Sequence, residues 1–272
     1  MHRPLGKVKQ AGGPRAKIFG LAFWHGGPLS LAVLGAFLNA IGILLGGLLG
    51  LALSRPLPLR AQLFFRSALA VSAFFFGLRL VWFNLSGTFL SGLKQVLLAL
   101  VAVGLGFWLG KLLGLQKLSN RLGRRAAQAI AAAQAGVPVN TADGLGACVV
   151  LFCAAPLGLM GAVVDGLSGY FWLLAVKAVM DALAMVSFVK LFRWPAALAA
   201  CPVFAILGGI AFACQYDVAP WLATRHLVAP VNAAAGFICC AVTLVILEVR
   251  RVELANFLPA LIVAPVLAWW LG

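Results

Sequence analysis

The sequence predicts an all-α fold, a polytopic bundle of about eight transmembrane helices, and two observations lead to this prediction. First, 64% of the 272 residues are hydrophobic and only 10% are charged, whereas soluble domains carry about 45–50% apolar and about 25% charged residues. A soluble fold of this length keeps too much surface in water to hide that excess. Second, the apolar residues form long continuous runs, whereas transmembrane strands would appear as alternating segments of about ten residues. We therefore expect the lipid bilayer to be the partner of most of this surface.

Eight apolar runs approach the length of about 20 residues that a helix needs to cross about 30 Å of hydrocarbon. We place them at residues 30–53, 62–83, 93–113, 144–164, 170–188, 196–216, 227–247 and 254–271. Together they predict one transmembrane domain over residues 29–272, preceded by a basic tail over residues 1–28.

The charge distribution predicts how the chain crosses the membrane. The chain has 21 Lys and Arg against 6 Asp and Glu, a net charge of +15. Because the basic residues gather between the apolar runs, they indicate membrane orientation, and we expect no nucleic-acid partner. The connections after the second, fourth and sixth runs contain a single basic residue, Arg225. Those after the first, third, fifth and seventh contain Arg55, Arg60, Lys117, Arg121, Arg124, Arg125, Lys190, Arg193, Arg250 and Arg251. This asymmetry predicts that the basic connections lie in the cytoplasm and that both termini lie outside it.

The N-terminal tail disagrees with this orientation. Residues 1–28 carry five Lys and Arg that would lie outside. The apolar stretch 18–24 is too short for the hydrophobic part of a signal peptide, and a long span follows it. Either the first run is not a simple crossing, or the native chain starts further in, near Val33.

The longest connection, residues 115–142, has a helical pattern of its own. Apolar residues recur at intervals of three and four positions, and basic residues occupy the other face. This pattern predicts an amphipathic helix on the cytoplasmic membrane surface, close to anionic headgroups. A basic loop that sets orientation explains the same residues, and the two interpretations are compatible.

Two series of glycines lie four residues apart within the runs. They are Gly42, Gly46 and Gly50 in the first run, and Gly106, Gly110 and Gly114 in the third. Small residues at this spacing form a smooth stripe along one helix face and allow helices to approach closely. We expect the two helices to pack on each other or on another subunit, in preference to forming a flexible pathway.

Lys177 and Asp181 are the clearest candidates for a functional site. Both lie deep in the fifth run, where an ionised side chain costs about 2.5–3.5 kcal/mol. Their spacing of four residues places them on one helix face, where they can form an ion pair. A functional pair that meets a solute and a structural pair that fixes one helix fit the sequence equally well.

Four further residues are polar or interrupt a run. Asp165 ends the fourth run, where a turn is the simplest explanation. Asn39 and Asn256 lie in the first and last runs, and hydrogen bonds between helices explain them better than a solute site does. Pro156 is expected to kink the fourth run and to free backbone carbonyls.

Motifs for catalysis, cofactors and metals are missing from the sequence. The six cysteines show no paired C-x-x-C spacing, and the three histidines form no metal-binding pattern. There is no phosphate-binding loop and no dinucleotide fingerprint. We therefore predict no catalytic residues, no metal site and no cofactor.

The run LFCAAPLGLMGAVVDGLSGYFWLLAVKAVMD spans residues 151–181. It resembles the core signature of a bacterial inner-membrane family of unknown function that includes YqgA and YdfK. The first and last runs are similar to its two terminal motifs, and the resemblance covers nearly the whole chain from about Val33. The matching residues are Gly35, Asn39, Gly46, Gly47, Phe152, Cys153, Gly161, Asp165, Gly166, Leu167, Lys177, Asp181, Asn256, Leu258, Pro259 and Pro265.

The chain also departs from that family at three positions. Val164 and Leu207 stand where the family tends to have Gln, and Lys111 stands where it has Glu. If those polar groups contact a solute in the relatives, the site is reduced here. The resemblance implies a multi-pass membrane protein and no established activity.

Two functions from different classes follow from these residues. The first is passage of a small solute or ion through the bundle, with Asn39, Asp165, Lys177, Asp181 and Asn256 as its polar lining. The second is a non-catalytic scaffold or subunit whose glycine stripes bind a partner helix. A homo-oligomer fits both.

Overall fold

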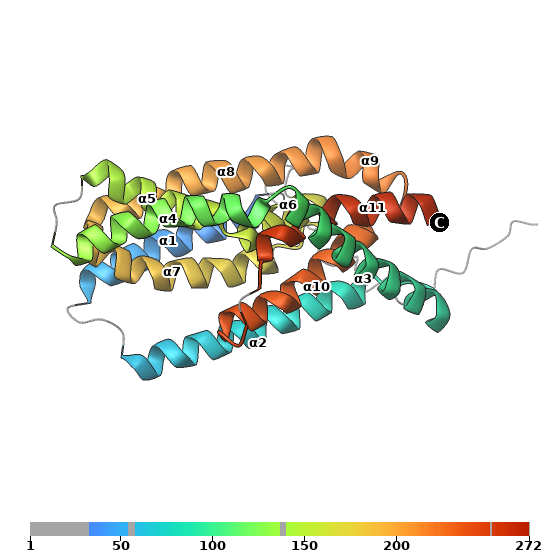
Figure 1. The fold of residues 1–272 in the computed structure, drawn as a ribbon, viewed down its shortest axis with the longest axis horizontal. Helices are drawn as coiled ribbons and strands as arrows, with labels where there is room; N and C mark the ends of the chain where they lie inside the picture. Colours follow the sequence, from blue (N-terminus) through green and yellow to red (C-terminus); the bar gives the residue numbers. More distant parts are fainter. Residues whose placement is uncertain (1–32, 54–57, 137–139, 251, 272) are drawn as a thin grey trace, which may run out of the picture.

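The computed structural model describes residues 33–53, 58–136, 140–250 and 252–271, and all its regular elements in these ranges are helices (Figure 1). The predicted basic tail, residues 1–28, lies outside the described residues. The prediction of an all-α transmembrane bundle is confirmed. The described residues contain seven helical segments long and apolar enough to cross a membrane, and an eighth if one bent pair counts as a single span.

The helices follow one another with short connections. They are α1 (Leu34–Ala52), α2 (Leu59–Phe83), α3 (Phe89–Leu112), α4 (Leu115–Gln134), α5 (Thr141–Ala154), α6 (Pro156–Ser168), α7 (Trp172–Phe192), η3 (Trp194–Ala199), α8 (Ala200–Ala213), η4 (Cys214–Val218), α9 (Ala219–Ala223), α10 (Val228–Ile246), η5 (Leu254–Phe257) and α11 (Ala260–Leu271). The segment from η3 to α9 counts as one span.

The fourth predicted span is broken in the middle. Helix α5 ends at Ala154, α6 begins at Pro156, and the two axes differ by 58°. Pro156 has no backbone N–H for the carbonyl of Phe152 one turn earlier, and its ring opposes a continuous helix there. At the first position of α6 the same residue costs nothing, because that N–H would have no partner in the helix. The predicted kink is therefore confirmed.

The packing of the helices agrees with eight alternating crossings. Helix α1 runs parallel to α7, since Gly35 lies on Leu174 and Gly46 lies on Ala182. Helices α2 and α10 run antiparallel, since Gly77 lies on Gly236 while, further along, Ala70 accepts a hydrogen bond from Thr243. Helices α1 and α7 are the first and fifth predicted spans, and they cross in the same direction. Helices α2 and α10 are the second and seventh, and they cross in opposite directions, as eight alternating spans require.

Helices α6 and α7 lie between two apolar cores. One core combines residues of α1, α5, α7 and α8, and the other combines residues of α2, α6, α7 and α10. Leu174 on α7 belongs to the first core, whereas Leu173 on the same helix belongs to the second. Side chains on α7 are therefore enclosed on both sides, and this explains how polar groups on that helix can lie far from lipid and water.

The glycine stripe of α1 packs inside the chain, on α7. A Cβ atom at Gly42 would lie 2.6 Å from the carbonyl oxygen of Ala178, and one at Gly46 would lie 2.2 Å from that of Ala182. At Gly50 the same atom would meet Val186 and Val189. Because real Cβ atoms do not approach so closely, glycine is what allows α1 and α7 to come together.

The stripe of α3 packs on a different partner. Gly106 lies against Ala260 of α11, and Gly110 lies against the backbone of Asn256 in η5. The two stripes therefore do not pack on each other. Gly114 is not part of the packing, because the nearest atom to a Cβ there would be Lys117 Cδ at 3.9 Å. It is the residue just before α4, and its φ is +66°. Glycine adopts this left-handed conformation without the steric cost of a side chain.

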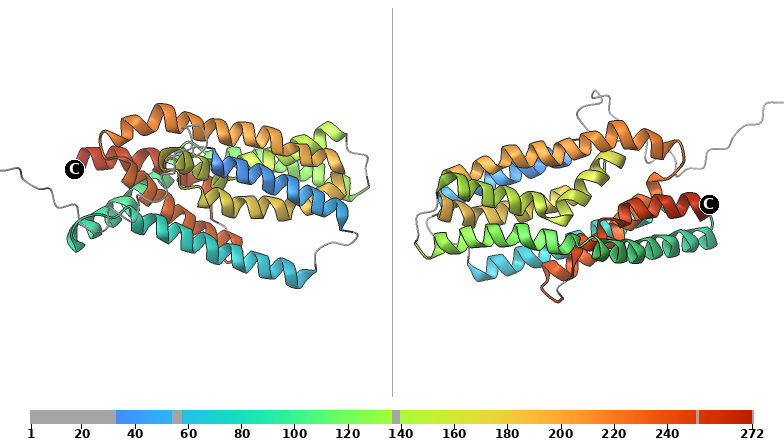
Figure 2. Two further views of the ribbon diagram at one scale, coloured as in Figure 1. Left: turned by 180° about the vertical axis from the view of Figure 1, so that it is seen from behind. Right: turned by 45° about the horizontal axis from the view of Figure 1, so that its top comes forward.

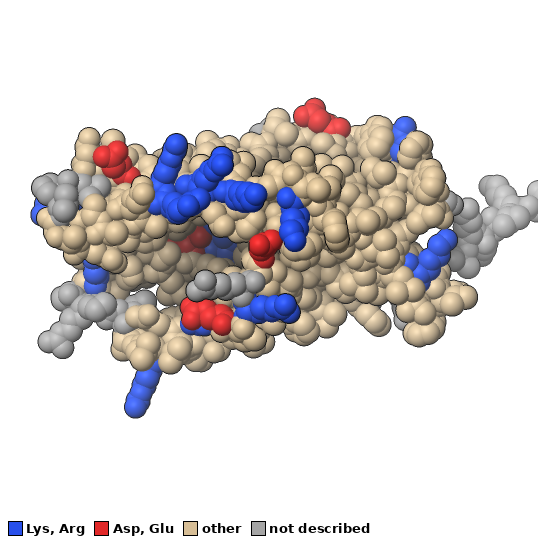
Figure 3. All heavy atoms as spheres, viewed as in Figure 1, with Lys and Arg blue, Asp and Glu red and all other residues tan. Residues whose placement is uncertain are grey.

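Helix α4 forms where the amphipathic pattern predicts a helix. An alanine-rich face of α4 packs against α5 and the first core. On this face Ala126 is buried, and Ala129, Ile130 and Ala133 are partly buried. Figures 1 and 2 show α4 running lengthwise beside α5, whereas a helix lying flat on the membrane surface would cross the spanning helices. Packing of the alanine face against α5 explains this direction. Figure 3 shows Lys and Arg atoms gathered over α4. Its position relative to the membrane stays a prediction.

Candidate solute site

Six polar or charged side chains are buried in the described part of the chain. They are Asn39, Asp165, Lys177, Asp181, Asn232 and Asn256. Five of these were candidates from the sequence, and the structure divides them into two places. Asn39, Asp165, Lys177 and Asp181 lie along the contacts of α1, α6 and α7, and we call these four residues the buried polar cluster.

Lys177 and Asp181 form the ion pair that their spacing predicts. The Lys177 ammonium donates a hydrogen bond to Oδ2 of Asp181, one turn further along α7. The residues are only 1% and 7% exposed, so the pair is almost completely removed from solvent. A buried pair of this kind tolerates its desolvation only while both partners remain.

The ammonium lies at the break between α5 and α6. Nζ of Lys177 is 5.7 Å from the ring centre of Phe152, in the last turn of α5. A Cβ atom at Gly158, in the first turn of α6, would lie 2.5 Å from Cε of Lys177. The C-terminal end of a helix carries partial negative charge, and an aromatic face also attracts a cation. The broken span thus provides room for the lysine stem and an aromatic face near its charge.

Asp165 is held by the backbone of α1. The N–H of Gly35 donates a 2.9 Å hydrogen bond to Oδ2 of Asp165. The carboxylate is fully buried, and the sequence expectation of a simple turn at Asp165 is wrong, because α6 continues to Ser168 and ends at Gly169. A charged side chain inside the bundle is usually paired, yet Oδ1 of Asp165 has no hydrogen-bond partner among the described residues.

Asn39 lies one turn after Gly35 on α1 and is fully buried beside Asp181. Within the described residues, neither Oδ1 nor Nδ2 of Asn39 has a partner with normal hydrogen-bond geometry. Leaving a buried amide unsatisfied costs about 1–3 kcal/mol. The buried polar cluster therefore contains one satisfied pair and three polar atoms without partners.

Asn256 lies elsewhere and has another role. Its Oδ1 accepts a 3.0 Å hydrogen bond from the backbone N–H of Gln116, in the first turn of α4. Its Nδ2 donates to Glu253 at 2.7 Å. Asn256 thus joins η5 to the start of α4, as a capping side chain does, and the structure does not bring it together with the buried polar cluster.

The buried Asn232 likewise belongs to a separate network. Its Nδ2 donates to Oδ1 of Asn84 at 3.1 Å, and its Oδ1 accepts from Ser168 at 3.4 Å. These bonds join α10, the end of α2 and the end of α6. They agree with the expectation that such asparagines bond between helices.

Two residues beside the cluster were not among the sequence candidates. Gly35 supplies the hydrogen bond to Asp165, and Gly158 makes room for Lys177. The first could have been found from its position, one helical turn before Asn39. The second could not, because its partner is 19 residues away on another helix. Leu207 of α8 also borders this region, 3.6 Å from the Cβ position of Gly158.

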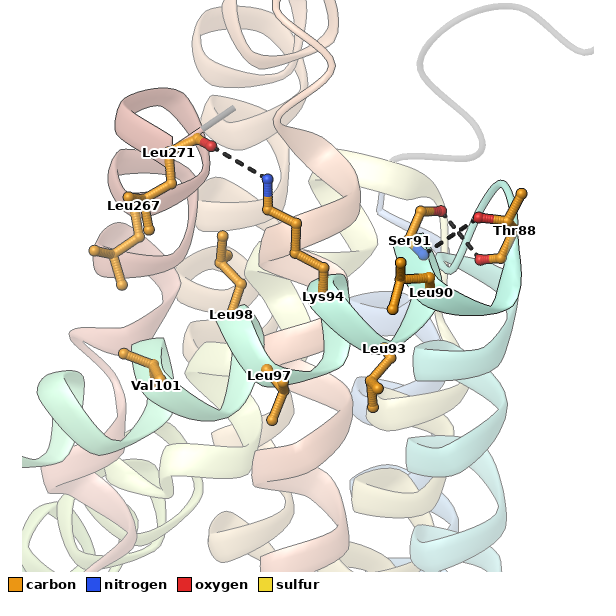
Figure 4. Close-up of a pocket in the computed structure, with 10 residues that line it drawn as sticks. All are labelled: Thr88, Leu90, Ser91, Leu93, Lys94, Leu97, Leu98, Val101, Leu267 and Leu271. Carbon is orange, nitrogen blue, oxygen red and sulfur yellow. Dashed lines mark hydrogen bonds between the residues drawn. The ribbon is translucent and has the colours of Figure 1, made fainter.

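Two surface pockets lie away from the cluster. One, of about 700 Å³, is a groove between α3 and α11 with Lys94 among leucines (Figure 4). Another, of about 560 Å³, lies between α4 and α5. Neither is lined by a residue of the buried polar cluster, so the cluster is enclosed in this conformation.

The fold and the site together define a polytopic α-helical membrane protein with an ion pair buried at a broken helix. The chain belongs to the family DUF554, described as a protein of unknown function, which it matches over residues 34–269. The resemblance noted from the sequence is thus confirmed.

Two curated proteins are similar to the chain over most of its length. The uncharacterized protein YqgA of Escherichia coli (strain K12) is 29% identical over 241 residues, which is 88% of this chain and 97% of YqgA. The uncharacterized membrane protein YdfK of Bacillus subtilis (strain 168) is 23% identical over 232 residues, covering 85% of this chain and 94% of YdfK. No solved structure matches the chain.

Proposed function

We propose that this membrane protein carries a small solute or ion across the bacterial inner membrane, along the contacts of α1, α6 and α7. The single observation that supports this most is the Lys177–Asp181 pair at the break between α5 and α6. Ionisable residues within membrane spans are rare, and they mark substrate, ion and proton pathways. Discontinuous helices near the membrane centre are typical of the binding sites of secondary transporters.

The enclosed state of the cluster suggests how such a protein works. The four residues are between 0% and 7% exposed, so a solute reaches them only when helices move apart. A 58° bend at Pro156 provides a boundary about which α5 and α6 can move separately. Alternating access by rigid-body rocking around a fixed central site has this requirement.

The proposal includes the orientation read from the charges, with both termini outside and the basic connections in the cytoplasm. It includes no catalysis, no cofactor and no nucleic-acid partner. A homo-oligomer is compatible with it. The scaffold alternative loses its main support, because the stripes of Gly42 and Gly106 are covered by α7 and α11 of the same chain.

A screen of purified protein by thermal unfolding, against ions and small metabolites, tests the proposal. A ligand at a hundredfold excess over its dissociation constant stabilises the folded state by about 2.7 kcal/mol. Any compound that raises the melting temperature is then tested for flux in proteoliposomes. The double variant Lys177→Met, Asp181→Asn is expected to remain folded and to lose flux.

A second variant separates function from structure. Exchange of the two residues, Lys177→Asp with Asp181→Lys, keeps an ion pair on the same helix face but reverses its direction. If the pair only stabilises the fold, the exchanged protein keeps its flux. Undiminished flux in the double variant contradicts the proposal outright.

A further inference from the structure

The ionisable residues of the described interior do not balance in charge. Of the side chains that are buried there, Asp165 and Asp181 are acids and Lys177 is the one base. With Lys177 paired to Asp181, the carboxylate of Asp165 is the excess charge. Its hydrogen bond from Gly35 is a neutral donor and leaves one negative charge uncompensated. An isolated charge in such surroundings is costly, and a bound counter-ion removes that cost.

Two of the atoms without partners are oxygens of the kind that bind a counter-ion. Asp165 Oδ1 and Asn39 Oδ1 are both fully buried and both lack a hydrogen-bond donor within the described residues. Gly35 binds Asp165 and stands one turn before Asn39, and side chains of a helix lean toward its N-terminus. The amide of Asn39 therefore leans along α1 toward the turn that holds Asp165.

We propose that the buried polar cluster binds one monovalent alkali cation, with Asp165 Oδ1 and Asn39 Oδ1 among its ligands. The inference rests on the proposed transport function, for which it names the class of the carried or coupled ion. Carboxylate and amide oxygens are the ligands that hard cations prefer. One unit of excess charge suits a monovalent ion, because a divalent ion would leave the buried site positive. A proton on Asp165 would also balance the charge, and the comparison of salts with pH below distinguishes the two.

Equilibrium binding to the purified full-length protein in detergent tests the inference without measuring flux. The probes are the chlorides of lithium, sodium and potassium, compared with choline chloride at the same pH and ionic strength. The readouts are the melting temperature and the binding of radioactive sodium or rubidium. At least one alkali cation is expected to stabilise the protein in a saturable manner, whereas choline is not.

Variants locate the effect. Asp165→Asn keeps an oxygen for the N–H of Gly35 and removes the excess charge, so the apparent Kd for the cation is expected to rise about tenfold or more. Asn39→Leu keeps the side-chain shape, removes a ligand and is expected to weaken binding in the same direction. Asp217→Asn removes an exposed carboxylate and serves as the matched control, with unchanged binding.

Three results overturn the inference. They are equal melting temperatures in all four chloride salts, a full cation response in Asp165→Asn, and stabilisation by lower pH with no difference among the salts. The outcome is distinct from that for transport. If the unmodified protein shows no cation response but the double variant loses flux, only the cation site is overturned. If the unmodified protein responds to a cation but the double variant keeps its flux, only the transport role of the ion pair is overturned.

Discussion

The backbone N–H of Gly35 on α1 donates a hydrogen bond to the buried carboxylate of Asp165 on α6, 130 positions further along the chain. This bond connects the start of the first span to the second half of the broken span. It also depends on Gly35 having no side chain, because a Cβ there would lie 2.7 Å from Oδ2 of Asp165 and 2.7 Å from Leu174.

Replacing Gly35 by alanine is therefore expected to destabilise the protein. Overpacking of this kind costs about 1–3 kcal/mol, so the variant should unfold at a lower temperature in a detergent melt. Gly104→Ala is the matched control, since nothing lies within 4 Å of a Cβ at that position of α3. Alanine there gains helix propensity, and a melting temperature at or above that of the unmodified protein is expected. Equal loss in both variants would contradict the contact.

The two partners of the buried ion pair are expected to be strongly coupled. Lys177→Met alone leaves Asp181 buried without its cation, at a cost of about 3–5 kcal/mol. Adding Asp181→Asn removes the second charge, so the double variant should recover most of that stability. The four free energies of unfolding form a double-mutant cycle. A double variant no more stable than the single one would show that the pair is not coupled as described.

The contact of α1 with α7 predicts a second glycine effect. A Cβ at Gly46 would lie 2.2 Å from the carbonyl oxygen of Ala182, which is backbone and cannot move aside alone. Gly46→Ala is expected to lower the melting temperature and the monodisperse fraction on size exclusion. Gly209→Ala, on an open part of α8, should behave as the unmodified protein does. Normal behaviour of the Gly46 variant would mean that the helices are further apart.

Asn256 is expected to affect α4 and not transport. Asn256→Ala removes the acceptor for Gln116 N–H and the donor to Glu253, a change worth about 1–2 kcal/mol. Hydrogen exchange should become faster in the first turns of α4, while flux of any transported compound stays the same. Loss of flux with unchanged hydrogen exchange in α4 would instead indicate that Asn256 lines the solute pathway.

The orientation can be measured with reporter fusions. Alkaline phosphatase, which is active only outside the cytoplasm, is expected to be active when fused after residue 271. A fusion within α4, after Arg125, is expected to be inactive, and a fluorescent protein should give the opposite pattern. The positive-inside rule is the reason, since α4 carries four of the basic residues that we place inside. An inactive C-terminal phosphatase would reverse the whole arrangement.

Much of the fold follows from local sequence properties. Long apolar runs predict spans wherever they occur, because each helix satisfies its own backbone hydrogen bonds in lipid. Pro156 predicts a break, and the spacing of Lys177 and Asp181 predicts a pair, because both effects act within one helical turn. The amphipathic pattern also predicts helix α4, but the connection itself does not reveal that the alanine face of α4 packs on α5.

The sequence by itself determined that this is a helical membrane protein, where its spans lie, and that Lys177 and Asp181 lie deep in one of them. Only the tertiary structure decided which polar residues meet. It brings Asp165 to Gly35 and places Asn39 beside Asp181, while it sends Asn256 to the start of α4. It also covers the glycine stripe of α1 with α7 and that of α3 with α11 and η5. The physical reason is that helix formation depends on neighbours within a turn, whereas contacts between helices depend on the complementary shapes of surfaces distant in the chain.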